Sequence, residues 1–89
     1  MIRMTLGDVA GPLGGRLLGG DAAFAAVSTD SRHLAPGELF VALAGPRFDG
    51  NDYVGQAAVH GAVAAVVSRP VDVAMPCLLV PDTRIALGR

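Results

Sequence analysis

Two uninterrupted apolar runs, residues 39–43 and 62–67, flank a segment with helical spacing, and this arrangement constrains the fold more than any other feature. Neither run contains a polar residue, which is typical of strands that are covered on both faces. Between them, four residues at helical spacing would share one buried face: Val54, Ala57, Ala58 and Gly61. A strand, a helix and a strand within roughly thirty residues predict a βαβ unit with parallel strands and a right-handed crossover.

The remaining elements are short. Thr5 is expected to cap a first helix, with Asp8 in the capping-box position and Gly14-Gly15 at its end. Extended segments are expected at 16–18, 24–28 and 77–80, and Asn51 or Asp52 should cap the helix that follows the 39–43 strand. Together these elements predict an α/β fold, with a small mixed or parallel sheet and flanking helices.

The composition excludes several classes of function. Eighty-nine residues, 52% of them hydrophobic, suit one domain with a modest core. A net charge of −1 gives no overall attraction to nucleic acid or anionic membrane, so any anion must be bound by local groups. The single cysteine, Cys77, lies in an apolar run and is expected to be a buried thiol rather than a nucleophile. No disulfide framework, signal peptide or membrane-length apolar run is seen, and we therefore expect a cytoplasmic location.

Two polar loops follow apolar segments, at 29–32 (Thr-Asp-Ser-Arg) and 45–51 (Gly-Pro-Arg-Phe-Asp-Gly-Asn). In parallel α/β sheets, ligands bind beyond the carboxyl ends of the strands. Each loop carries an arginine together with hydroxyl or backbone donors, which suits a phosphorylated ligand. The alternative is that the loops are tight connections that only brace the sheet.

The residues of the second loop allow both readings. Gly45 and Gly50 let the backbone approach a ligand, Arg47 could contact phosphate or stack on a base, and Phe48 could form an apolar wall. Alternatively, Phe48 fills the core and Arg47 is solvated.

In the first loop, Asp30 and Arg32 are best explained as structural partners, because Asp side chains commonly stabilise local turns. Thr29 and Ser31 alternate with them, so their hydroxyls could point together into a groove. That arrangement would suit a nucleobase, whose edge offers both acceptors and an N–H donor.

Catalytic machinery is not recognisable. His33 and His60 are isolated, no metal-binding spacing is present, and no phosphate loop ending in Gly-Lys-Ser/Thr occurs, since the chain has no lysine. We therefore assign no catalytic residue, no metal ligand and no cofactor to these 89 residues.

Three motifs in combination resemble the N-terminal domain of the Mur ligases: Thr-Asp-Ser-Arg, Pro-Gly-x-Leu-Phe-Val-Ala-Leu-x-Gly and Arg-Phe-Asp-Gly-x-Asp-Tyr. The resemblance covers essentially the whole chain. It implies a domain that binds the uridine diphosphate part of the substrate through the positions Thr29, Ser31, Pro46, Arg47 and Phe48. Supporting positions would be Asp30, Arg32, Gly45, Asp49, Gly50 and Asn51. Family members usually have His where this chain has Asn51, so a ring contact is not available there, although Asn could still cap the helix.

The resemblance also implies the wider reaction. Mur ligases are ATP-dependent amide ligases of peptidoglycan synthesis, and ATP and Mg would bind in domains outside this sequence. The motifs are more similar to those of members that join D-alanyl-D-alanine to UDP-N-acetylmuramoyl-tripeptide than to those of members that add the third residue. Residues 1–82 would then form the substrate-binding domain, and 83–89 the start of a linker helix to a central ATPase domain. The alternatives are a Mur ligase that adds the third residue, a non-catalytic nucleotide-binding module and a structural interaction domain.

Overall fold

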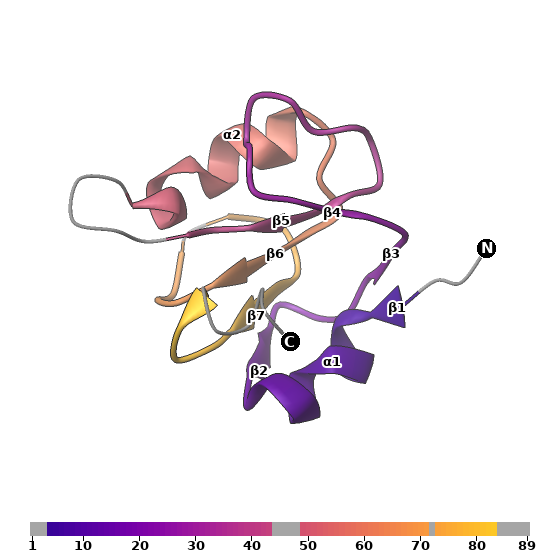
Figure 1. Ribbon diagram of the computed structural model, residues 1–89, viewed down its shortest axis with the longest axis vertical. Coiled ribbons are helices and arrows are strands. Elements are labelled where there is room, and N and C mark those ends of the chain that lie inside the picture. The colour runs from indigo at the N-terminus through magenta and orange to yellow at the C-terminus, as the bar shows by residue number, and fades with distance from the viewer. Residues whose placement is uncertain (1–3, 44–48, 72, 84–89) are drawn as a thin grey trace.

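The computed structural model describes residues 4–43, 49–71 and 73–83. In chain order the elements are β1 (Met4–Thr5), α1 (Leu6–Leu13), β2 (Arg16–Leu18), β3 (Ala23–Phe24), β4 (Val27–Ser28), β5 (Leu39–Val41), the 3₁₀ helix η1 (Gly50–Tyr53), α2 (Val54–Val59), β6 (Ala64–Val67) and β7 (Cys77–Leu79). Figure 1 shows α1 and α2 on opposite sides of the sheet.

The main sheet of the described residues has the strand order β2-β7-β6-β5-β4. β4, β5, β6 and β7 pair in parallel, and β2 pairs antiparallel with β7 at one edge. β1 and β3 form a separate antiparallel pair. The predicted α/β class with a mixed sheet is confirmed, as is the βαβ unit formed by β5, α2 and β6.

Two cores explain the uninterrupted apolar runs. Successive side chains of a strand point to opposite faces of the sheet. Accordingly, Leu39 and Val41 join the core beneath α1, whereas Phe40 joins the core beneath α2. β6 alternates in the same way, and all four of its residues are buried. A run without polar residues is required because neither face of these strands meets water.

The first helix forms as predicted. The Thr5 hydroxyl accepts a hydrogen bond from the Asp8 backbone N–H at 3.1 Å, and the Asp8 carboxylate accepts one from the Thr5 backbone N–H at 3.0 Å. This reciprocal capping box satisfies two N–H groups at the start of α1. Gly14 ends the helix in the left-handed conformation, with φ of +64°.

Two local predictions were wrong. The expected extended segment 24–28 is divided between two sheets, because β3 pairs with β1 and β4 pairs with β5. The helix after β5 is not capped by Asn51 or Asp52. It is preceded by η1, whose N-cap is Asp49, and the Asp49 carboxylate accepts from the Asn51 backbone N–H at 2.9 Å.

β2 has the predicted bounds, whereas β5, β6 and β7 are shorter than expected, although ladder hydrogen bonds continue one residue past β5 and β7. The Ala42 N–H donates to Val66 O at 2.9 Å, and the Val80 N–H donates to Val67 O at 2.8 Å. Within the described ranges, no helix is long and apolar enough to cross a membrane.

Candidate functional site

The loop 29–32 leaves the carboxyl edge of the main sheet. β4 and β5 are parallel neighbours, with Val27 opposite Leu39 and Ser28 opposite Phe40. Thr29 and Ala42, which follow these strands, therefore emerge at the same edge, where α/β proteins bind ligands. Four positions of the second predicted loop, Gly45, Pro46, Arg47 and Phe48, lie outside the described residues.

Asp30 organises the first loop. Its backbone N–H donates to the Ser28 hydroxyl at 3.1 Å, and its carboxylate accepts from the Arg32 backbone N–H at 2.9 Å. The same carboxylate lies 2.7 Å from Nδ1 of His33 and 3.6 Å from Nε of Arg32. The predicted structural partnership of Asp30 and Arg32 is confirmed.

These contacts also change the acidity of Asp30. The hydrogen bond from His33, followed by that from the Arg32 backbone, lowers the pKa of the Asp30 carboxyl to about 2. Asp30 is therefore a fixed anion near neutral pH, and it is already engaged by neighbours in its own loop. It is poorly suited to act as a general base.

Ser31 connects this loop to α2. Ser31 is 8% exposed, and its hydroxyl donates a hydrogen bond to Oε1 of Gln56 at 2.7 Å. Gln56 lies three residues after Tyr53, so both face the loop from the same side of the helical segment. Neither Tyr53 nor Gln56 was expected from the sequence to be part of a site.

A pocket of about 350 Å³ lies between the loop and the helix, and its lining residues are Thr29, Asp30, Ser31, Arg32, Tyr53 and Gln56. Thr29 and Ser31, predicted to face one groove, both line it. The Arg32 side chain is 72% exposed, so its guanidinium group lies at the rim of the pocket. The lining offers hydroxyl, carboxamide and guanidinium groups, together with the Asp30 carboxylate, which is already engaged by Arg32 and His33. The neutral groups suit a polar ligand, and an anionic part of it would lie at the rim beside Arg32.

The described part of the second loop forms a separate cluster. Asn51 is buried, and its amide nitrogen donates to Asp49 Oδ1 at 2.6 Å and to the Ser68 hydroxyl at 3.0 Å. The Ser68 backbone N–H donates in return to Asn51 Oδ1 at 3.1 Å. Asn51 thus holds η1 against the end of β6 instead of capping a helix.

The carboxylates of this cluster are paired. Arg69 lies 3.3 Å from Asp49 and 2.5 Å from Asp52. Hydrogen bonds from Asn51, with a smaller contribution from Arg69, lower the pKa of Asp49. At the base of the loop, the Gly50 N–H donates to Leu43 O at 2.7 Å, and an added Cβ on Gly50 would lie 2.7 Å from that oxygen. Asp49, Gly50 and Asn51 thus play structural roles at the ends of the loop.

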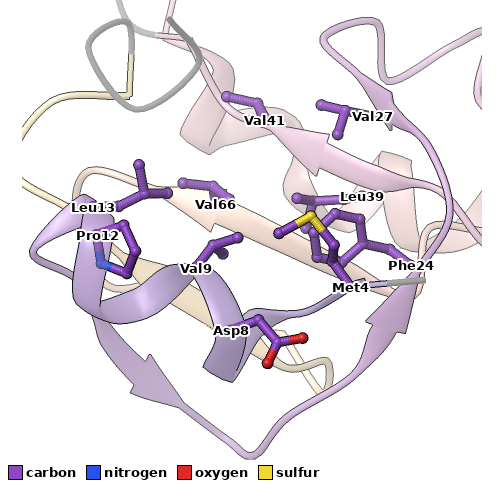
Figure 2. A pocket seen from close by; sticks show the side chains of 10 residues that line it. All are labelled: Met4, Asp8, Val9, Pro12, Leu13, Phe24, Val27, Leu39, Val41 and Val66. Carbon is purple, nitrogen blue, oxygen red and sulfur yellow. The ribbon is translucent and has the colours of Figure 1, made fainter. Parts of the chain in front are cut away.

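A second hollow lies between α1 and the sheet. Figure 2 shows that its lining is apolar apart from Asp8, whose carboxylate belongs to the capping box. Its volume is about 330 Å³, and its lining residues are Met4, Asp8, Val9, Pro12, Leu13, Phe24, Val27, Leu39, Val41 and Val66. A nucleotide needs polar partners that this hollow does not offer, so the pocket at the carboxyl edge is the candidate site.

Metal-binding and nucleophilic groups are scarce in the part of the chain that the structure describes. No cluster there of three or more His, Cys, Asp or Glu side chains could hold a metal ion. Cys77 is 3% exposed, and burial raises the pKa of its thiol. The prediction that it is a buried thiol is confirmed.

Comparisons with known proteins agree on one family. Residues 14–86 match the family described as "Mur ligase family, catalytic domain". The UDP-N-acetylmuramoyl-tripeptide--D-alanyl-D-alanine ligase of Escherichia coli K12 is 51% identical over 99% of this chain. The UDP-N-acetylmuramoyl-L-alanyl-D-glutamate--2,6-diaminopimelate ligase of Geobacillus thermodenitrificans is 45% identical over 79% of it. A crystal structure of MurF from Acinetobacter baumannii superposes with a TM-score of 0.85 at 34% identity, over 98% of this chain.

The chain spans 20% of the length of the Escherichia coli ligase and 20% of the Acinetobacter baumannii chain. The family match extends over most of the described structure, and the similarity to the solved structure extends over nearly all of it. The resemblance found in the sequence motifs is confirmed: this chain belongs to the Mur ligase family.

Proposed function

We propose that residues 1–82 form the N-terminal, substrate-binding domain of an ATP-dependent ligase that joins D-alanyl-D-alanine to UDP-N-acetylmuramoyl-tripeptide in peptidoglycan synthesis. Residues 83–89 begin the linker to a central ATPase domain, where ATP and Mg bind. The ligase acts in the cytoplasm, where its nucleotide substrates are made. The role of the domain is to hold the uridine diphosphate end of the substrate.

The observation that carries this proposal is the polar pocket between loop 29–32 and α2. It lies at the carboxyl edge of the parallel strands, and Thr29 and Ser31 line it together. Arg32 at the rim provides a cation for a diphosphate. In the proposed complex, Pro46, Arg47 and Phe48 complete the site from the second loop, with Arg47 near the base or the diphosphate.

Holding a remote part of the substrate contributes to the reaction rate. Binding energy from the nucleotide end restricts the position of the tripeptide carboxylate that reacts in another domain. Loss of this domain should therefore lower kcat as well as raise KM.

The choice of reaction rests on the degree of similarity. The ligase that uses D-alanyl-D-alanine is more similar over the whole chain, 51% over 99%, than the diaminopimelate ligase, 45% over 79%. The alternative, supported by the similarity to the diaminopimelate ligase, is that the enzyme adds the third residue of the peptide. A full-length protein carrying this chain distinguishes them directly. We expect product from UDP-N-acetylmuramoyl-tripeptide and D-alanyl-D-alanine, and none from the dipeptide substrate and a diamino acid; the reverse result would establish the alternative.

Binding is tested by adding UDP to the isotopically labelled protein and following backbone amide shifts. We expect shifts at 29–32, at 45–51 and around Tyr53 and Gln56. Shifts confined to the α1 side of the sheet would contradict the proposed site. In the full-length ligase, Arg47→Ala should raise the KM for the UDP substrate, and unchanged kinetics would remove Arg47 from the site.

A further inference from the structure

Gln56 lines the pocket and contacts the loop through one side-chain hydrogen bond. Its Oε1 accepts from the buried Ser31 hydroxyl at 2.7 Å, across 25 residues of sequence. A carboxamide oxygen has two lone pairs, and its nitrogen has two N–H donors. Among the described residues, no other side-chain hydrogen bond of Gln56 occurs. One lone pair of Oε1 and both N–H groups are therefore available to a ligand in the pocket.

Ser31 also determines the orientation of the Gln56 carboxamide, that is, which of its oxygen and nitrogen atoms faces the loop. A rotated Gln56 would present its nitrogen to Ser31, whose hydroxyl proton would then lose its acceptor. Within the described part of the chain, Ser31 has no second side-chain partner, and it is buried. Because an unsatisfied buried donor is costly, the orientation with Oε1 toward Ser31 is favoured.

We propose that Gln56, oriented by Ser31, is the residue that selects uracil over cytosine in the nucleotide substrate; this inference rests on the proposed function. The imide edge of uracil carries an N–H donor beside a carbonyl acceptor. Oε1 of Gln56 accepts from that N–H, and the Gln56 amide donates to the carbonyl. Cytosine presents a bare ring nitrogen and an amino group at the same positions, so an acceptor would face an acceptor and a donor would face a donor.

The structure also explains why rotation does not remove this selectivity. An unconstrained carboxamide could turn over and match cytosine equally well. The Ser31 hydroxyl opposes that rotation, so Ser31 acts as a positioning residue and Gln56 as the specificity residue. Tyr53, three residues earlier, lines the same pocket and supplies a ring beside the base.

The test is calorimetric titration of UDP and CDP into the full-length protein that carries this chain. The wild type should bind UDP roughly tenfold or more tightly than CDP, as for other bidentate base contacts. Gln56→Glu keeps the acceptor for Ser31 but replaces the amide donor with a second acceptor. It should weaken UDP binding roughly tenfold and bring the UDP-to-CDP ratio to unity or below.

Three further variants separate the roles. Gln56→Ala is a second variant without the added charge, which could disturb folding in Gln56→Glu. It should also remove the preference for UDP over CDP. Ser31→Ala should reduce the ratio of UDP affinity to CDP affinity, and Ser31→Thr, which retains a hydroxyl, should keep it near the wild-type value. Val59→Gln lies on the same helix, at a position 85% exposed and outside the pocket, and should change neither affinity.

The outcomes distinguish the inference from the function on which it rests. If the wild type binds UDP but the ratio of affinities is unchanged in Gln56→Glu and Gln56→Ala, Gln56 is only a brace between loop and helix, and the inference fails alone. If the wild type binds neither nucleotide, both the proposed function and the inference fail.

Discussion

Asn51 and Ser68 exchange two hydrogen bonds: the Asn51 amide donates to the Ser68 hydroxyl at 3.0 Å, and the Ser68 backbone N–H donates to Asn51 Oδ1 at 3.1 Å. The first residue lies in η1 and the second follows β6, so the pair joins the segment before α2 to the carboxyl edge of the sheet. Asn51 is 5% exposed, and a buried carboxamide destabilises the folded chain when its hydrogen-bond partners are removed.

Asn51→Ala should lower the free energy of unfolding by about 1–3 kcal/mol, because it leaves the Ser68 N–H without its partner and removes the donor to Asp49. Urea denaturation of the chain measures the loss. Ser68→Ala is the matched variant: it removes one hydroxyl but keeps the backbone contact, and should cost about 1 kcal/mol. A larger loss for Ser68→Ala than for Asn51→Ala would contradict the assignment of Asn51 as the centre of this cluster.

Stability in acid should depend on Asp30. The pKa of its carboxyl is about 2 in the folded chain, against an ordinary value of 3.8. Between these values the unfolded chain binds more protons than the folded one, so stability increases with pH. The contribution of Asp30 is complete above about pH 4 and is lost as the pH falls through the folded value. The difference in free energy of unfolding between wild type and Asp30→Asn should therefore shrink as the pH falls from 3.8 to about 2.

The titration itself can be followed by NMR of the Asp30 carboxyl carbon. His33→Ala removes the largest cause of the shift, and the midpoint should move upward, while the Arg32 backbone contact keeps it from returning fully. A wild-type midpoint near 3.8, or one that His33→Ala leaves in place, would show that the two side chains do not interact in solution.

The sequence predicts the layered part of this fold well. The runs at 39–43 and 62–67 identify β5 and β6 because a strand buried on both faces has no polar position, and few other structures permit that pattern. The capping box of α1 is a local motif whose partners are three residues apart, so it is readable directly. Asp30 and Arg32 are likewise near neighbours.

The site was less predictable because its contacts are not local. Ser31 meets Gln56 across 25 residues, and only the pairing of β4 beside β5 and the position of α2 bring them together. The available signal was a pair of polar side chains three residues apart, Tyr53 and Gln56, at positions that neighbour each other on the surface of the helical segment. Asp49 was missed as the cap because η1 starts one turn earlier than the apolar spacing of α2 indicates.

Cys77 should be protected from alkylation in the folded chain. The residue is 3% exposed, its Sγ lies 3.4 Å from Met75 O, and burial raises the pKa of the thiol. Since the thiolate is the reactive form, both access and ionisation oppose reaction. Iodoacetamide labelling, followed by mass spectrometry, should be slow in buffer and rise with urea in parallel with unfolding. Because the chain has one cysteine, the signal has a single source. Equal rates in buffer and in denaturant would contradict the buried placement.

Two glycines at the two ends of α2 should respond to alanine in opposite directions. Gly61 follows the helix with φ of +109°, and an added Cβ would lie 3.0 Å from Cα of Pro36. Gly61→Ala therefore combines an unfavourable backbone conformation with a close contact, and should lower the free energy of unfolding by about 1–3 kcal/mol. The Gly61 carbonyl also accepts from the Gly37 N–H at 3.0 Å, so strain here should disturb the turn that precedes β5.

Gly55 is the control, because it lies inside α2, is exposed, and would place an added Cβ in open space. Gly55→Ala should raise the free energy of unfolding by about 0.5–1 kcal/mol, since alanine loses less backbone entropy in a helix. Thermal and urea denaturation of both variants, measured side by side, test the pair. Destabilisation by both substitutions would indicate that α2 does not extend over Gly55, whereas tolerance of both would show that the chain leaves the helix at Gly61 by another path. Only opposite signs agree with a helix that contains Gly55 and ends before Gly61, which is the geometry that brings β6 back beside β5.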